Sequence, residues 1–165
     1  MSRRAFLGLG SNMGDRTRYL QEAIARLRAA QGVNFLRQSR VYETEPIGLV
    51  DQPRFLNMVV EVDIGEEMRA RELLALIKQI EADVGRTKRE RWGPREIDID
   101  ILLIEGEEVK EDDFEVPHPR MWERAFAVLP LAELAPDLKA PTGETAAELG
   151  ERLQQEQGIH AAFHL

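Results

Sequence analysis

The order of its apolar segments is the feature that most constrains how this chain of 165 residues folds. Four segments are rich in β-branched and aromatic residues, as strands are, and they cover residues 3–9, 33–45, 55–64 and 97–104. Two others, 16–30 and 68–84, repeat apolar residues at helical spacing, and Gly32 and Gly85 near their ends suit C-terminal caps. The order β-α-β-β-α-β predicts an α+β fold, a ferredoxin-like βαββαβ sandwich.

The C-terminal third of the chain adds helices to this sandwich. Residues 105–116 form a short acidic excursion, and a short helix follows within 117–136, restrained by Pro130 and ended by Pro136. A final helix is predicted over 146–157, and the tail beyond it is expected to be loose. Because the chain is too short for two ordinary domains, we expect residues 1–165 to form one domain.

Composition and charge exclude several classes of protein. The chain has no cysteine, which excludes disulfides and thiolate metal sites and favours a reducing compartment. No apolar run approaches the ~20 residues of a membrane span, and the apolar run at the N-terminus is too short for a signal peptide. The net charge of −8 argues against a general nucleic-acid binder. We therefore expect a cytoplasmic protein that binds neither membrane nor nucleic acid.

Two aspartates interrupt the last of the four strands. Asp98 and Asp100 point to the same face of the strand, with Cα atoms roughly 6.5 Å apart, and Leu102 and Ile104 continue that face. The opposite face takes Ile97, Ile99, Ile101 and Leu103. Buried like charges repel each other and lose solvation, which a cation would offset, and oxygen ligands without Cys or His favour Mg²⁺. The alternative is that both carboxylates face solvent or pair with nearby arginines.

A basic segment directly precedes this strand. Residues 86–95 hold five basic side chains against one acidic residue, Glu90: Arg86, Lys88, Arg89, Arg91 and Arg95. On an acidic protein such a patch suits a compact polyanion, and a Mg²⁺-polyphosphate would fit between it and the aspartates. Trp92 among these cations is expected to cover a ligand. The alternatives are a solvated surface loop, and a cation–π contact between Trp92 and Arg91 or Arg95.

The segment "GLGSNMGD" near the N-terminus contains glycines, but it does not match a dinucleotide-binding fingerprint. The third glycine of that motif would fall at Met13, whereas Gly14 comes one position late. A tight turn in which Asn12 or Asp15 caps the following helix is the better account.

Four stretches together resemble one family. "RWGPREIDIDIL" is similar to the signature of 6-hydroxymethyl-7,8-dihydropterin pyrophosphokinases, "GSNMGD" follows the first strand as it does in the family, and "ETEPIGLVDQPRFLNMVVEV" resembles the pterin-binding segment. "VPHPRMWERAFAVLPLAELAP" resembles the family's C-terminal motif. The similarity covers nearly the whole chain, in the right order.

The resemblance implies an activity. Members of this family transfer the terminal diphosphate of ATP to the hydroxymethyl group of the pterin and release AMP, a step of folate biosynthesis. It implies a single pyrophosphokinase domain over residues 1–165, ATP as co-substrate, two Mg²⁺ ions and a monomer.

The resemblance also implies roles for particular residues. Asp98 and Asp100 would hold both Mg²⁺ ions close to the attacking hydroxyl, and Arg86 and Arg95 would contact phosphate oxygens. The implied pterin contacts are the rings of Phe55 and Phe126, the side chains of Asn57, Thr44 and Trp92, and the backbone near Ile47. The implied nucleotide contacts are Glu81, Lys88, Arg91, His118, Arg124 and the backbone at Ile101.

Two rival functions fit the same fold class. A ferredoxin-like RNA-binding module would need an aromatic and basic pattern on its central strands, which residues 3–9 and 55–62 do not supply. Another Mg²⁺-dependent nucleotide enzyme, such as a nucleotidyl cyclase or transferase, would use a similar aspartate pair. It would have no use for Phe55, Asn57 and Phe126.

Overall fold

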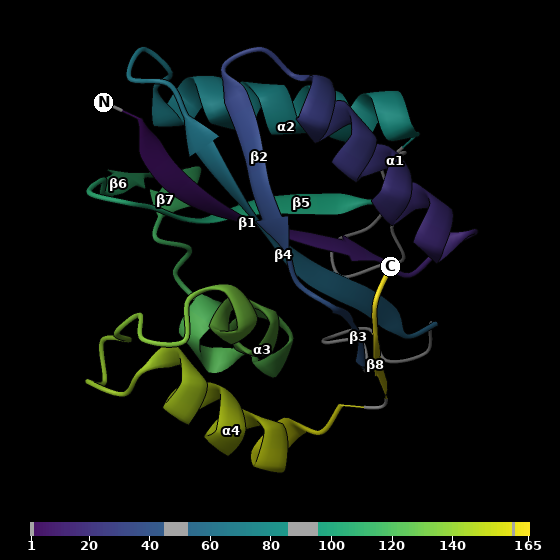
Figure 1. The fold of residues 1–165 in the computed structure, drawn as a ribbon, viewed down its shortest axis with the longest axis vertical. Helices are drawn as coiled ribbons and strands as arrows, with labels where there is room; N and C mark the ends of the chain where they lie inside the picture. The colour runs from purple at the N-terminus through teal and green to yellow at the C-terminus, as the bar shows by residue number, and fades with distance from the viewer. Residues whose placement is uncertain (1, 45–52, 86–95, 160) are drawn as a thin grey trace.

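A central antiparallel sheet organises the protein, seen in a computed structural model that describes residues 2–44, 53–85, 96–159 and 161–165 (Figure 1). Six strands of the described chain form this sheet in the order β5-β1-β4-β3-β8, and β2 also pairs with β4. Their bounds are β1 Arg3–Ser11, β2 Val33–Gln38, β3 Val41–Thr44, β4 Phe55–Ile64, β5 Asp98–Ile104 and β8 Ala161–Phe163. The α+β class predicted from the sequence is confirmed.

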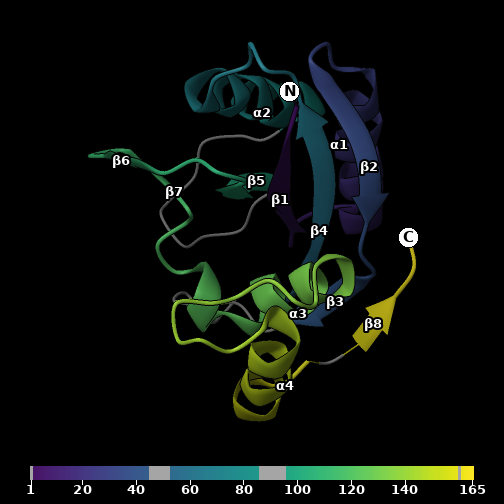
Figure 2. The same ribbon diagram turned by 60° about the vertical axis from the view of Figure 1, so that its left-hand side comes forward.

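Helices cover both faces of the sheet, as Figure 1 and Figure 2 show. The helices α1 (Arg16–Ala29) and α2 (Ala70–Val84) lie on one face over the larger apolar core. On the other face lies α3 (Ala125–Leu134), preceded by the 3₁₀ turn η1 (Met121–Glu123), and α4 (Ala146–Gln157) packs on α3. Among the residues described, no helix is long and apolar enough to cross a membrane.

The first two helices begin and end where local chemistry dictates. The carboxylate of Asp15 accepts a hydrogen bond from the amide of Arg18 and so caps α1. Gly85 ends α2 at φ 116°, a left-handed conformation that glycine adopts without steric cost. Gly32 also has a positive φ, but it lies in the turn after α1, whose C-cap is Ala30.

The strand predicted over residues 33–45 is in fact two strands, β2 and β3. Ser39 separates them. Its backbone amide donates to the carbonyl of Val59, and its side-chain hydroxyl accepts a hydrogen bond from the amide of Val59. Its hydroxyl also donates to the carbonyl of Arg40. Because a side chain takes over one backbone contact with β4, the strand bends at this point while both halves stay paired with β4.

Two segments that were expected to be irregular, the acidic excursion and the C-terminal tail, form strands instead. The acidic segment after β5 is a hairpin, β6 (Val109–Glu111) paired with β7 (Phe114–Val116). The tail carries β8, in which Ala162 pairs with Tyr42 of β3. Leu165 packs against the larger core, so the C-terminus is attached to the sheet.

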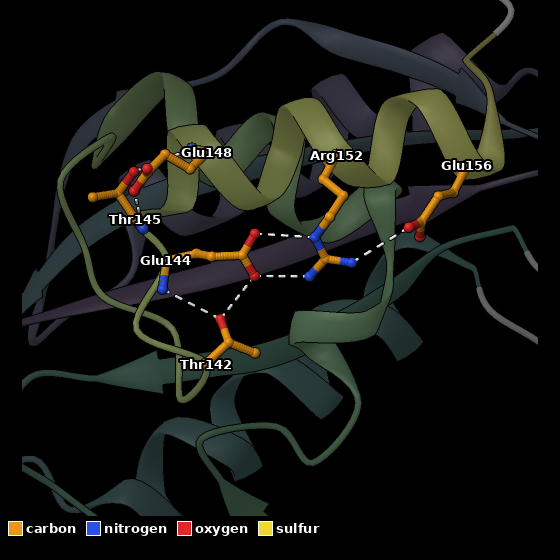
Figure 3. A network of polar contacts seen from close by, with 6 residues as sticks. All are labelled: Thr142, Glu144, Thr145, Glu148, Arg152 and Glu156. Carbon is orange, nitrogen blue, oxygen red and sulfur yellow. Dashed lines mark hydrogen bonds and ion pairs between the residues drawn. The ribbon is translucent and has the colours of Figure 1, made fainter.

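The helix α4 is fixed by a network of polar contacts at its N-terminal end (Figure 3). Thr145 and Glu148 form a capping box, in which each side chain accepts a hydrogen bond from the other residue's amide. Arg152 donates to both carboxylate oxygens of Glu144, at 3.0 and 2.8 Å, and also contacts Glu156. These contacts tie the preceding loop to the helix.

Candidate active site

The aspartate pair lies on β5, at the edge of the sheet. The neighbouring strand is β1, in which Gly10 pairs with Asp98 and Gly8 pairs with Asp100. Both aspartates are half-buried, while the intervening Ile99 is fully buried in the core under α1 and α2. The prediction that the two carboxylates share one face of a strand covered on both sides is confirmed.

The predicted alternation fails beyond Leu102. The register between β1 and β5 shifts there, since Phe6 pairs with Leu103 but Leu7 pairs with Ile101. This β-bulge leaves Leu102 as the extra residue. Leu103 therefore packs with Leu102 on the aspartate face, whereas Ile104 joins the opposite core, the reverse of the prediction for both residues.

A strip without side chains lies next to the aspartates. Gly8 and Gly10 alternate with the buried Leu7 and Leu9, so their missing side chains would point to the aspartate face. A Cβ atom on Gly10 would lie 2.9 Å from Oδ1 of Asn57. We call Gly8 and Gly10 the glycine floor. The side chain of Leu102 borders it, 3.5 Å from where a Cβ on Gly8 would stand.

Polar and aromatic side chains stand on the far side of the glycine floor. Asn57 of β4 pairs with Gly10, and its Nδ2 donates to the hydroxyl of Thr44 at 2.8 Å. Both residues are buried. The ring of Phe55 would lie 3.6 Å from a Cβ on Gly10. With its amide nitrogen oriented by Thr44, Asn57 presents its oxygen toward the floor, where it can accept a hydrogen bond.

The turn η1 and the start of α3 bring cationic and aromatic groups to the same face. Arg124, the N-cap residue of α3, lies with its guanidinium 5.4 Å from the ring centre of Phe126. Burial lowers the pKa of Arg124, an effect that the nearby Asp100 and Asp98 oppose. Burial also lowers the pKa of His118, whose amide donates to the carbonyl of Leu102 at 2.7 Å. The backbone of His118 is thus attached directly to β5, and Nδ1 of its imidazole accepts a hydrogen bond from the amide of Arg120 at 3.2 Å.

The negative charge of the aspartates is only partly offset by these cations. Burial first, and then the charge of Asp98, raise the pKa of Asp100 to about 7, although Lys78 and Arg124 act in the opposite direction. A divalent cation would remove this cost, and half-buried carboxylate oxygens are ligands that suit Mg²⁺. Within the described ranges, no group of three or more potential ligand side chains forms a metal site. Phosphate oxygens and water would have to complete the coordination.

Glu81 of α2 fixes the strand that carries the aspartates. It is only 3% exposed, and its Oε2 accepts a hydrogen bond from the amide of Ile99 at 2.6 Å. Lys78 lies 3.3 Å from its other oxygen. Ile99 stands between the two aspartates, so this contact holds the segment that presents them.

Comparison with known proteins identifies the family. A family model described as 7,8-dihydro-6-hydroxymethylpterin-pyrophosphokinase matches residues 6–136. The chain belongs to this family. A relative in Bacillus subtilis, 2-amino-4-hydroxy-6-hydroxymethyldihydropteridine pyrophosphokinase, is 42% identical over 99% of this chain and 98% of its own length. The chain is thus a pyrophosphokinase.

Two larger proteins contain a similar unit. The mitochondrial folate synthesis bifunctional protein of Pisum sativum is 45% identical over 78% of this chain, which matches only 24% of that protein. A crystal structure of wild-type Plasmodium falciparum HPPK-DHPS shares the fold, with a TM-score of 0.71 and 15% identity over 96% of this chain. The pyrophosphokinase spans 47% of that structure's chain. Together with the family, the Pisum sativum relative places the enzyme in folate biosynthesis.

The predicted site residues of the pyrophosphokinase divide into three groups. One face of the sheet carries the described side chains Thr44, Phe55, Asn57, Asp98, Asp100, His118, Arg124 and Phe126. Glu81 and Ile101 lie behind it, with Ile101 buried in the core. Six predicted residues lie outside the described ranges, namely Ile47, Arg86, Lys88, Arg91, Trp92 and Arg95.

Sequence reasoning missed two features of this site. The glycines at positions 8 and 10 were considered only as part of a dinucleotide motif, whereas their spacing of two on a strand already indicated one bare face. The side chain of Asn12 was considered as a helix cap, but its Nδ2 donates to the carbonyl of Pro53 at 3.1 Å. It thereby ties the end of β1 to the segment that precedes Phe55.

Proposed function

We propose that this pyrophosphokinase transfers the terminal diphosphate of ATP to the hydroxymethyl group of the pterin on the face that the glycine floor opens. The observation that carries the proposal is the arrangement across the floor. The aspartate pair stands on one side, and Asn57, Thr44 and Phe55 stand on the other. A polar, flat ligand and a polyphosphate would thus meet over Gly8 and Gly10.

The pterin binds at the Asn57 side of the floor. Phe55 and Phe126 stack on the two faces of the ring, a contact that favours flat heterocycles. Asn57, Thr44 and the backbone near Ile47 bind its polar edge, and Trp92 covers it. Support comes from the oxygen of Asn57, which faces the floor while its nitrogen is held by Thr44.

The nucleotide binds at the aspartate side. Asp98 and Asp100 hold two Mg²⁺ ions, which would neutralise the phosphates when bound. His118, from the segment before η1, and Arg124, the N-cap of α3, contact the phosphates, and their closeness to the aspartates supports this role. The remaining contacts that we propose for ATP are Glu81, the backbone at Ile101, and the cationic residues Arg86, Lys88, Arg91 and Arg95.

The transfer itself exchanges one phosphorus–oxygen bond for another. The hydroxymethyl oxygen forms a bond to the β-phosphorus of ATP, and the bond from that phosphorus to the oxygen shared with the α-phosphate breaks. AMP leaves with the shared oxygen, and the hydroxyl proton is released. The protein contributes the alignment of the two substrates and the charge around the phosphates.

A product analysis tests the proposal. The enzyme is incubated with ATP, Mg²⁺ and 6-hydroxymethyl-7,8-dihydropterin, and AMP is measured against ADP. We expect AMP, and a loss of at least about 100-fold in kcat for Asp98→Ala or Asp100→Ala, because charge stabilisation in a dry site is large. Asp137→Ala, at an exposed loop position, is the matched control. Formation of ADP, or near-normal turnover by Asp100→Ala, would refute the proposed site.

We propose that the arrangement is ferredoxin-like, supported by the strand order β5-β1-β4-β2 with α1 and α2 on one face. We also propose that residues 1–165 act as one domain, as a monomer and in the cytoplasm, consistent with the lack of cysteine and the net charge of −8.

A further inference from the structure

The helix α3 begins without a capping side chain of its own. Its N-cap residue is Arg124, which makes no side-chain hydrogen bond to the helix. The first amides of a helix have no partner within the helix and need one from elsewhere. The amide of Arg124 donates to the carbonyl of Met121, and its carbonyl accepts from Ala127 and Val128. The carbonyl before Arg124 and the amide after it still need partners.

Gln157, the last residue of α4, supplies both partners. Its Oε1 accepts the hydrogen bond of the Ala125 amide at 2.9 Å, and its Nε2 donates to the carbonyl of Glu123 at 2.7 Å. The planar amide group thus bridges the backbone on either side of Arg124. Its orientation is determined by this complementarity, because the flipped amide would place oxygen against oxygen.

The position of Gln157 is itself well fixed. The network around Glu144 and Arg152 holds the start of α4 (Figure 3). Leu149 and Leu153 pack against Val128 of α3 in a shared apolar cluster. The helix therefore delivers the Gln157 side chain to a defined point, although the residue itself is exposed.

We infer that Gln157 is a positioning residue of the active site, acting through Arg124 and, two residues further along the chain, through Phe126. The inference rests on the proposed function, in which Arg124 contacts the phosphates and Phe126 stacks on the pterin. The family model ends at residue 136, so Gln157 lies outside the region that defines the family. It is a contribution of this chain's C-terminal helix to both substrate subsites.

Binding measurements on matched variants test the inference. The dissociation constants of a non-hydrolysable ATP analogue with Mg²⁺, and of hydroxymethylpterin, are measured by calorimetry. Gln157→Ala removes both hydrogen bonds to the backbone beside Arg124. We expect each dissociation constant to rise roughly five-fold, about the net effect of one uncharged hydrogen bond. Gln157→Glu keeps the acceptor for Ala125 but places a carboxylate oxygen against the carbonyl of Glu123, so we expect it to weaken binding as well. Gln155→Ala, also exposed on α4, leaves both constants unchanged.

A double-mutant cycle separates positioning from general stability. In an Arg124→Ala background, Gln157→Ala is expected to have no further effect on the ATP analogue, while it still weakens pterin binding. Additive losses for the analogue would overturn the inference. A lowered melting temperature with unchanged dissociation constants would also overturn it.

The same measurements distinguish a failure of the proposed function from a failure of the positioning role alone. If Arg124→Ala and Phe126→Ala alone left both constants unchanged, the proposed subsites would be wrong, and the role of Gln157 with them. If the single variants weakened binding and Gln157→Ala did not, only the positioning role would be refuted.

Discussion

The fold strongly disfavours the charge of Asp100. Its pKa is raised from 3.8 to about 7, first by burial and then by Asp98. Lys78 and Arg124 reduce this effect without abolishing it. Such a residue suits a site that a cation and a polyphosphate complete. The cation stabilises the ionised carboxylate, and the negative phosphates bind more readily once the cation is present.

The raised pKa of Asp100 predicts how stability depends on pH without ligands and metal. Between pH 3.8 and about 7, the folded protein keeps a proton that the unfolded chain has lost. The free energy of unfolding therefore decreases as pH rises through that window, because Asp100 ionises more readily in the unfolded chain than in the folded protein. Urea unfolding at pH 4 and pH 7.5 checks it. Asp100→Asn should gain stability relative to wild type at the higher pH only, and Asp137→Asn should not; equal differences at both pH values would contradict this.

Gly10 tests the importance of the glycine floor. In Gly10→Ala the new methyl group would lie 2.9 Å from Oδ1 of Asn57, so the amide must move away from the pterin. We expect pterin affinity to fall about ten-fold, as the loss of a well-placed polar contact does, and ATP affinity to change much less. Gly65→Ala is the control, since no atom lies within 4 Å of the added group. Unchanged pterin binding in calorimetry would show that the floor is not part of the subsite.

At the scale of elements, the C-terminal strand β8 supports a strand of the candidate site. The strand β3 has only four residues and ends at Thr44. Tyr42 of β3 pairs with Asn57 on one side and with Ala162 of β8 on the other. The side chains of β8 are exposed, so its contribution is mainly the backbone ladder. A strand held on both edges is better ordered than one with a free edge.

Removing β8 should therefore loosen β3. For a chain that ends at Gly158, we expect faster amide hydrogen exchange over Val41–Thr44 and a pterin KM raised about three-fold or more, as for a loss of under 1 kcal/mol of ordering. The KM for ATP should hardly change. Phe163→Ala is the control, because it keeps the backbone pairing. Equal exchange over β3 in both proteins would exclude a supporting role for β8.

At the scale of the whole molecule, an acidic protein has to bind an anionic substrate. The net charge is −8, and the two aspartates add local negative potential at the nucleotide side. Mg²⁺ would compensate for both, since it binds carboxylates together with phosphate oxygens. The pterin subsite has no such requirement, because its described polar groups are neutral side chains of Asn57 and Thr44.

Removal of Mg²⁺ should therefore weaken the binding of the ATP analogue much more than that of the pterin. In EDTA we expect the affinity for the ATP analogue to fall by at least about ten-fold and pterin affinity to stay within about two-fold, since phosphate binding depends on the metal. Calorimetry at constant ionic strength checks this, with NaCl replacing MgCl₂ so that screening is unchanged. ATP binding of equal strength in EDTA would contradict a metal site at Asp98 and Asp100.

The sequence by itself determined the elements that depend on local periodicity. The bounds of β4 and α4, the left-handed cap at Gly85 and the shared face of Asp98 and Asp100 all follow from side chains a few residues apart. The family signature around these aspartates indicated the reaction class, which the family model confirms. The predicted roles of the basic segment concern residues outside the described ranges.

Only the tertiary structure decided the features that join distant segments. The break between β2 and β3 depends on the hydrogen bond between Ser39 and Val59. The strand β8 forms because its backbone pairs with the edge of β3. The glycine floor becomes a site because strand register sets Gly10 between Asp98 and Asn57. Backbone hydrogen bonds carry no side-chain pattern, so a sequence contains no periodic signal for them. The link from Gln157 to Ala125 spans 32 residues and arises only when α4 packs on α3.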